Sequence, residues 1–530
     1  MGVYGSLCLL HQPFFFTSNS SNVMSVFNKF FKDESKVLNH EKAEAYKLSA
    51  EMELYSVVVT SSLSSKFYET TEEQIDRIAA LIRKCDHQFV AQLAVYARTK
   101  MNLRSIPLFL IVELAKIHSG DNLVSKTIEK VVLRADEIME LLICYQWRNK
   151  SEGRKKLARL SHQVQVGLQH AFNRFDEYQF AKYDRDNLEV KLRDALFLVH
   201  PKAKDDAQQT IFDKIANKFL ETPYTWETEL SALGQYRFKT PEAKKQAFKE
   251  KWEELIGSGK LGYMALLRNL RNILCAEVND NSLKDVANRL SNPQEVARAK
   301  QFPFRFLSAY RELQDCKNGN VPLIMQALEE AVVATAQNIA GFDEHTRVLL
   351  ACDVSGSMYT PISEKSTVKA YDVGLVLAML LKNRCKYVVS GIFGDSWKVI
   401  NMPASGILSN VMQMYSREGE VGYTTNGYKV IEYLRRRKIA MDKVMIFTDC
   451  QMWDSNDGNK KIQHEWTKYK AMAPQAKLYL FDLVGYGQSP LKMLDNDVAL
   501  IAGWSDKVFD MLEALENGSS IVEEIRKIEL

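Results

Sequence analysis

The 530-residue chain has few of the features that mark specialised protein classes. Its eight cysteines are spread singly, and none forms a Cys-x-x-Cys pair. This spacing argues against a structural zinc site and against a disulfide-rich secreted fold. No segment approaches the ~18–20 uninterrupted apolar residues that a membrane helix needs. The formal net charge is only +4, so a nucleic-acid site has to be a local basic patch. These absences predict a cytoplasmic protein that does not contact a membrane.

Apolar residues make up 46% of the chain and charged residues 26%, which is enough to fill packed cores. A single core stops growing near roughly 250–300 residues, so two or three units are expected. Residues 1–23 stand apart. They lack the basic start and the cleavage site of a signal peptide, and they match only a loose myristoylation pattern at Gly2 and Ser6. We predict a disordered extension here.

From about Lys42 to Asn338 the apolar residues recur with helical spacing. One predicted helix opens with a Thr-x-x-Gln capping box, Thr71 to Gln74. The predicted helices are about 12–18 residues long and are joined by short polar turns, so they should pack as antiparallel neighbours. A long series of such helices forms a curved solenoid of the HEAT type. No strict sequence period accompanies the series, so the repeat interpretation rests on the helices alone. We expect residues 24–343 to be all-α.

Strands and helices alternate in residues 344–530. Alternation of this kind indicates a doubly wound parallel sheet covered by helices on both faces. The predicted strands are residues 347–353, 386–394, 443–449, 477–485 and 497–504. In such sheets, ligands bind in the loops at the carboxyl ends of the strands.

Three of these loops carry oxygen side chains. Asp353, Ser355 and Ser357 follow the first strand, Thr425 opens a helix, and Asp449 ends a later strand. Hard oxygen ligands favour Mg²⁺, with Mn²⁺ and Ca²⁺ as alternatives. The sequence therefore predicts one divalent metal site. The other interpretation is that the two carboxylates only cap the helices that follow them.

Two sets of motifs resemble a known family. DVSGSM (353–358), TTN (424–426) and IFTD (446–449) are similar to the metal-ion-dependent adhesion site of von Willebrand factor A domains. ALLRNLRNI (265–273) and QFPFRFLSAYREL (301–313) resemble the helical TROVE module. The two modules in this order resemble the Ro autoantigen family, over roughly residues 40–530. The resemblance implies an α + α/β fold: a HEAT-like helical-repeat ring, then a von Willebrand factor A-like domain, in a monomer.

The same resemblance implies an RNA-binding scaffold. Ro proteins hold single-stranded 3′ ends of misfolded RNAs in a basic central hole, and small structured Y-like non-coding RNAs on the outer face, for quality control or processing. A dense basic cluster between residues 148 and 159 suits phosphate contact, with a solvated helix face as the alternative. The candidate RNA-binding residues are Arg154, Lys155, Lys156 and Arg159 from this cluster, and Lys182, Arg185 and Arg268 from the resemblance.

The resemblance also implies that the metal site docks a protein partner, such as an exoribonuclease, through that partner's carboxylate. An enzymatic role is not expected. A haloacid-dehalogenase phosphotransferase needs a second aspartate where this chain has Ser355, and a two-metal nuclease needs more carboxylates. The alternative function is a metal-dependent protein-adhesion module whose helical half binds proteins. Binding that weakens steeply with salt would distinguish RNA contact from this alternative.

Overall fold

In the computed structural model, the described residues are 27–28, 36–61, 63, 66, 68–151, 159–335, 342, 345–364, 366–453, 461–492, 497–503, 507, 509, 512, 515 and 519–530. Helices dominate up to residue 335. They are α1 (Ala50–Val59), α2 (Thr71–Ile82), α3 (His87–Thr99), α4 (Ser105–Ile117), α5 (Leu123–Val131), α6 (Asp136–Ser151), α7 (His162–Phe172), α8 (Glu177–Tyr183), α9 (Leu192–Val199), α10 (Asp206–Asn217), α11 (Trp226–Gln235), α12 (Pro241–Gly257), α13 (Tyr263–Arg268), α14 (Leu270–Cys275), α15 (Asp280–Ser291), α16 (Pro293–Ala299), α17 (Pro303–Gln314) and α18 (Val321–Thr335).

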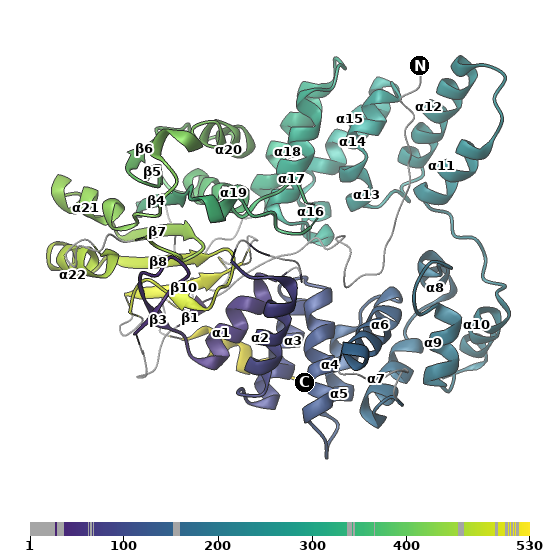
Figure 1. The fold of residues 1–530 in the computed structure, drawn as a ribbon. Coiled ribbons are helices and arrows are strands. Elements are labelled where there is room, and N and C mark those ends of the chain that lie inside the picture. The colour runs from purple at the N-terminus through teal and green to yellow at the C-terminus, as the bar shows by residue number, and fades with distance from the viewer. Residues whose placement is uncertain are drawn as a thin grey trace.

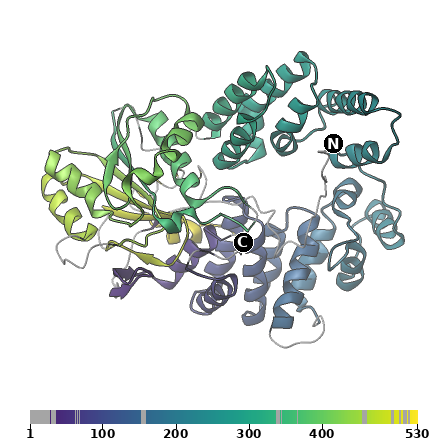
Figure 2. The same cartoon turned by 45° about the horizontal axis from the view of Figure 1, so that its top comes forward.

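Neighbouring helices pack against one another in this series, for example α3 on α4, α5 on α7 and α15 on α18. In Figure 1 the helices follow a wide arc that leaves the sheet at α1 and returns to it at α17 and α18. Figure 2 shows the same arc with its top turned forward. The expected N-terminal all-helical region is thus confirmed, apart from the short strands described below. Among the described helices, none combines the length and the apolar character needed to cross a membrane.

The C-terminal part holds a seven-stranded sheet in the order β1-β10-β8-β7-β4-β5-β6. Its strands are β4 (Arg347–Asp353), β5 (Tyr387–Phe393), β6 (Trp397–Val399), β7 (Lys443–Thr448), β8 (Lys477–Asp482) and β10 (Val498–Ala502), with β1 (Phe27–Asn28) from the N-terminal part. Neighbouring strands from β10 to β5 are parallel, while β1 and β6 pair antiparallel at the two edges. The prediction of a parallel sheet is therefore confirmed for the centre, and the whole sheet is mixed.

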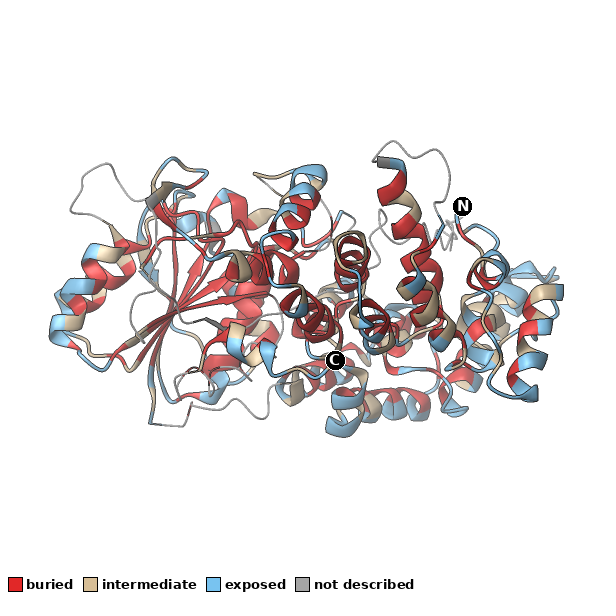
Figure 3. Ribbon diagram, turned by 90° about the horizontal axis from the view of Figure 1, so that it is seen from below, coloured by how far each residue is buried: buried red, intermediate tan, exposed pale blue. Residues whose placement is uncertain are grey.

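Helices α19 (Ala370–Arg384), α20 (Ile407–Tyr415), α21 (Tyr428–Arg437) and α22 (Ile462–Met472) accompany this sheet. Strands β7 and β10 are buried along their whole length, and Figure 3 shows the central strands red between the flanking helices. Burial on both faces explains why their sequences are continuous apolar runs rather than alternating ones.

Two predictions for the start of the helical region are wrong. Residues Glu44–Lys47 form a strand, β3, which pairs with β2 (Lys36–Leu38) and with β9 (Gln488–Ser489). Its conformation depends on a partner far away in the chain, which local spacing cannot reveal. The capping box of α2 lies one residue earlier than predicted, between Thr70 and Glu73.

The helical arc contacts the sheet domain at both of its ends. At the α1 interface, Ser56 donates to Asp482 Oδ2 at 2.7 Å and Thr60 donates to the Val484 carbonyl at 3.0 Å. At the α17 interface, Arg311 pairs with Asp372 of α19 at 2.6 Å. The last helix, α24 (Ile521–Arg526), returns from the sheet domain and packs on α3. The two halves are therefore joined at both ends of the arc.

Candidate functional site: a metal centre and a basic cavity

The predicted metal ligands lie together at the carboxyl edge of the sheet. Asp353 ends β4, which lies between β5 and β7, and Asp449 directly follows β7. Ser355 precedes a single 3₁₀ turn, Gly356–Tyr359, which carries Ser357. All four side chains belong to residues that are at most 4% exposed. The parallel register of β4 and β7 brings the two carboxylates to the same edge.

Hydrogen bonds orient these groups. The Ser355 amide donates to Asp353 Oδ1 at 2.8 Å, and the hydroxyl oxygens of Ser355 and Ser357 are 3.3 Å apart. Thr448 donates its hydroxyl to Asp353 Oδ2 at 2.6 Å, and the Gln451 amide donates to Asp449 Oδ1 at 3.0 Å. Neither carboxylate caps a following helix by its side chain, since α22 begins after Lys461 and the 3₁₀ turn after Ser355. The capping alternative is therefore wrong.

Electrostatics favour a cation here. Burial raises the pKa of Asp353 to about 6. Burial, followed by the nearby charge of Asp353, raises the pKa of Asp449 to about 8. The second oxygen of Asp449, Oδ2, is buried without a hydrogen-bond partner among the described residues. Two buried carboxylates, one of them with an unsatisfied oxygen, and two hydroxyls are a donor set that fits a hard divalent cation.

The threonine loop bridges the neighbouring strands. The Thr425 carbonyl accepts the Trp453 amide at 2.8 Å, and the Asn426 amide donates to the Gly394 carbonyl at 3.1 Å. Gly394 follows β5 and Trp453 lies beyond β7, so the loop crosses the end of β4. Thr425 is only 3% exposed, whereas Thr424 donates its hydroxyl to Asp395. This placement favours Thr425 as the residue of the site.

One group of residues near this site was not predicted. His40, Tyr68 and Tyr486 form an aromatic cluster, with ring centroids of His40 and Tyr68 5.0 Å apart. Asn39 donates to the Met452 carbonyl at 3.0 Å, although the two residues are 413 positions apart. No local sequence signal indicates such a contact. These residues bring the N-terminal segment onto the loop that carries Asp449.

The structure describes only part of the predicted RNA-binding set. Arg154, Lys155 and Lys156 lie outside the described residues, and Arg159 is exposed. Arg148 and Lys150, which extend the same cluster, are paired. Arg148 is buried and bonds to Glu113 at 2.6 Å, and Lys150 pairs with Glu189 at 2.9 Å. Phosphate contact is thus the wrong interpretation for Arg148.

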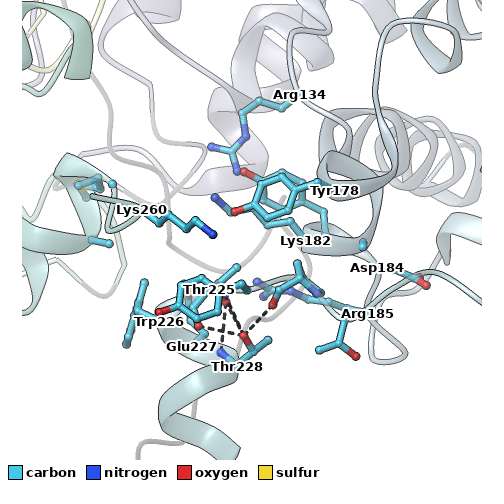
Figure 4. Close-up of a pocket in the computed structure, with 18 of the residues that line it drawn as sticks. Arg134, Tyr178, Lys182, Asp184, Arg185, Thr225, Trp226, Glu227, Thr228 and Lys260 are labelled. Carbon is cyan, nitrogen blue, oxygen red and sulfur yellow. Dashed lines mark hydrogen bonds between the residues drawn. The ribbon is translucent and has the colours of Figure 1, made fainter. Parts of the chain in front are cut away.

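By contrast, Lys182, Arg185 and Arg268 line one cavity of about 960 Å³ between α8, α11 and α13, together with Lys260. Figure 4 shows Lys182 and Lys260 reaching into the same space. Within the described part of the chain, none of these four cations forms an ion pair. Tyr178 lines the cavity and is 48% exposed. The cavity also has acidic residues on its wall, namely Asp184, Glu221 and Glu227.

The comparisons with known proteins agree with this architecture. Residues 218–339 match the TROVE domain, and residues 347–515 match the Ro60 vWA domain. Telomerase protein component 1 is 40% identical over 94 residues in Rattus norvegicus and 41% over 91 residues in Mus musculus, which is 18% and 17% of this chain. The chain spans only 3% of the length of those relatives.

Among solved structures, the crystal structure of the Deinococcus radiodurans RO (RSR) protein has a TM-score of 0.58 with this one. It is 17% identical, and the likeness covers 89% of this chain and 100% of that chain. At this identity the likeness shows the fold: a helical arc joined to a von Willebrand factor A-type sheet.

Proposed function

Because the chain belongs to the Ro60 family, with a TROVE domain followed by a Ro60 vWA domain, we propose that it is an RNA-binding scaffold. It holds single-stranded 3′ ends of misfolded RNAs and small structured non-coding RNAs for quality control or processing. An exoribonuclease that receives the held RNA end is the class of protein partner that this role requires.

The observation that carries this proposal is the basic cavity. Lys182, Lys260 and Arg268 come from separate elements yet line one space. Cations without carboxylate partners are available to phosphates, which contribute most of the affinity of nucleic-acid binding without reading sequence. The half-exposed ring of Tyr178, with Lys182 Nζ 6.0 Å from its centroid, offers a base a stacking surface. This combination suits single-stranded RNA.

Salt dependence tests the proposal. Affinity for a fluorescent single-stranded RNA is measured by anisotropy over a series of salt concentrations. We expect the logarithm of the binding constant to fall steeply with the logarithm of the salt concentration. In a Lys182→Gln, Lys260→Gln, Arg268→Gln variant, this slope should become shallower by about 0.7 for each phosphate contact removed. Arg271→Gln is the matched control, because Arg271 lies close to Arg268 but pairs with Glu312 at 3.3 Å. A triple variant that binds like the wild type would refute this site. Salt-independent binding would refute contact with the phosphates, and no binding would refute the RNA-binding function itself.

We further propose that Asp353, Ser355, Ser357, Thr425 and Asp449 hold one divalent cation, Mg²⁺ in the cell. The cation would neutralise two carboxylates whose burial is otherwise unfavourable. The protein residues orient the loops around it through the hydrogen bonds of Asp353 with Ser355 and Thr448. Isothermal titration with Mn²⁺ should show one site in the wild type and none in Asp353→Ala; equal binding by both would reject the assignment.

A further inference from the structure

The metal site lies under a part of the helical half. The Tyr68 phenol donates a hydrogen bond to Glu41, and a hydrogen bond with Ser357 is among the influences on its pKa. The charge of Asp449 also acts on this phenol. These influences place the Tyr68 phenol beside two residues of the proposed ligand set, on a loop that precedes α2.

Several further contacts fix this segment in place. The Tyr68 amide donates to the Tyr486 hydroxyl at 3.2 Å. The His40 amide donates to Gln451 Oε1 at 2.9 Å, while the Gln451 amide itself bonds to Asp449. The His40 ring stacks on Tyr68 with an interplanar angle of 4°. The residues that cover the site are thus connected to the same loop that carries one of its carboxylates.

The chemistry of this cover suits a cation. Since the single proton of the Tyr68 hydroxyl goes to Glu41, the phenol oxygen is the acceptor in its hydrogen bond with Ser357. The carboxylate of Glu41 adds a negative charge next to that oxygen. A carboxylate and a phenol oxygen are both hard donors, of the type that divalent cations of this class accept.

We propose that Tyr68, held by Glu41, is the chain's own cover for the metal site, so that cation binding and docking of residues 39–41 on the sheet domain stabilise each other. This inference rests on the proposed cation site. It differs from an open docking site for an outside carboxylate, because the chain itself occupies the approach. Linkage is reciprocal: whatever the cation adds to docking, docking adds to cation affinity.

Mn²⁺ titration of the full-length protein tests the cover. We expect Tyr68→Phe and Glu41→Gln each to weaken Mn²⁺ binding about five- to twentyfold, in the lower part of the usual range of such coupling. Glu72→Gln is the matched control, because it removes one negative charge from an exposed position of the neighbouring helix α2. Its affinity should equal that of the wild type.

Hydrogen exchange of the peptide 36–47 supplies a second measurement, which does not depend on the affinity of the variants. Mn²⁺ should slow exchange there in the wild type, and this protection should disappear in Tyr68→Phe. If the wild type binds Mn²⁺ but exchange is unchanged and both variants bind normally, the cover is refuted and the cation site stands. If wild type and Asp353→Ala behave alike, the cation site fails and the cover fails with it.

Discussion

Burial distinguishes two arginines that the sequence places in one basic cluster. Arg148 is 7% exposed and bonds to both carboxylate oxygens of Glu113, at 2.6 and 3.2 Å, whereas Arg159 is exposed. Removal of one partner of a buried pair costs roughly 3–5 kcal/mol where the other charge is left uncompensated. Here Lys116, which lies 3.1 Å from Glu113, compensates part of the remaining charge. We expect Arg148→Met to lower the urea midpoint of unfolding strongly and to leave the RNA affinity of the folded protein unchanged. Arg159→Met should leave stability unchanged; a stable Arg148→Met protein would contradict the assigned role.

The two buried carboxyls make the metal-free protein sensitive to pH. Folding raises their pKa to about 6 for Asp353 and about 8 for Asp449, so the folded state binds these protons more tightly than the unfolded chain. The stability that these two carboxyls contribute is therefore fully present at low pH and is lost as the pH rises through these pKa values. Between pH 5.5 and 8.5 we expect the melting temperature without metal to fall by at least a few degrees, since about 1 kcal/mol corresponds to ~2–4 °C in a domain of this size.

Calorimetry with and without Mg²⁺ measures this effect. A bound cation favours the ionised carboxylates, so saturating Mg²⁺ should flatten the pH dependence. Asp449→Asn removes the carboxyl with the larger shift and should flatten it without metal. The opposite result would be a melting temperature that rises from pH 5.5 to 8.5 in the chelated wild type by more than it changes in Asp449→Asn. It would show that both carboxyls are ionised in the folded protein without a bound cation.

At the scale of the element, the start of α2 separates two candidate caps. Thr70 accepts the Glu73 amide at 3.2 Å, and Glu73 accepts the Thr70 amide at 2.7 Å. Loss of such a cap costs about 1 kcal/mol. Thr70→Ala should therefore lower the unfolding free energy in urea by about this amount, while Thr71→Ala, inside the helix, should have little effect. A larger loss of stability in Thr71→Ala than in Thr70→Ala would place the cap at Thr71, as predicted from the sequence.

The elements also show what local sequence can reveal. The centre of the sheet was predictable, because β4 and β7 are continuous apolar runs that end in Asp353 and Thr448-Asp449. Strand β3 was not, since its four residues become a strand only by pairing with β2 and β9. The capping box was misplaced by one residue because Thr70–Glu73 and Thr71–Gln74 both satisfy the pattern.

The candidate site also has a part that the sequence predicts and a part that it does not. Its oxygen side chains follow strands, and parallel strands end at one edge, so their meeting could be inferred. Tyr68 and Tyr486 meet across 418 positions, and no periodicity records such a contact. Likewise Lys182 and Lys260 belong to different parts of the helical series and yet line the same cavity (Figure 4).

At the scale of the whole molecule, the helical arc is closed by contacts at both ends. The α1 interface includes the hydrogen bond of Ser56 with Asp482, and the α17 interface includes the ion pair of Arg311 with Asp372. Gly485 lies in the first of these at a φ of +76°, where an added Cβ would come within 2.1 Å of Thr60 Oγ1. This close approach ties the loop after β8 to α1.

A closed arc predicts that RNA enters the basic cavity end first. We expect a linear single-stranded RNA to bind at least about tenfold more tightly than a circular RNA of the same sequence and length, a difference of about 1.4 kcal/mol. Both have the same phosphates, so a purely electrostatic surface would bind them almost equally. Competition measured by anisotropy at fixed salt compares the two, and the Lys182→Gln, Lys260→Gln, Arg268→Gln variant serves as control because it should lose the preference for the linear form. Equal affinity in the wild type would mean that RNA reaches the protein from outside the arc.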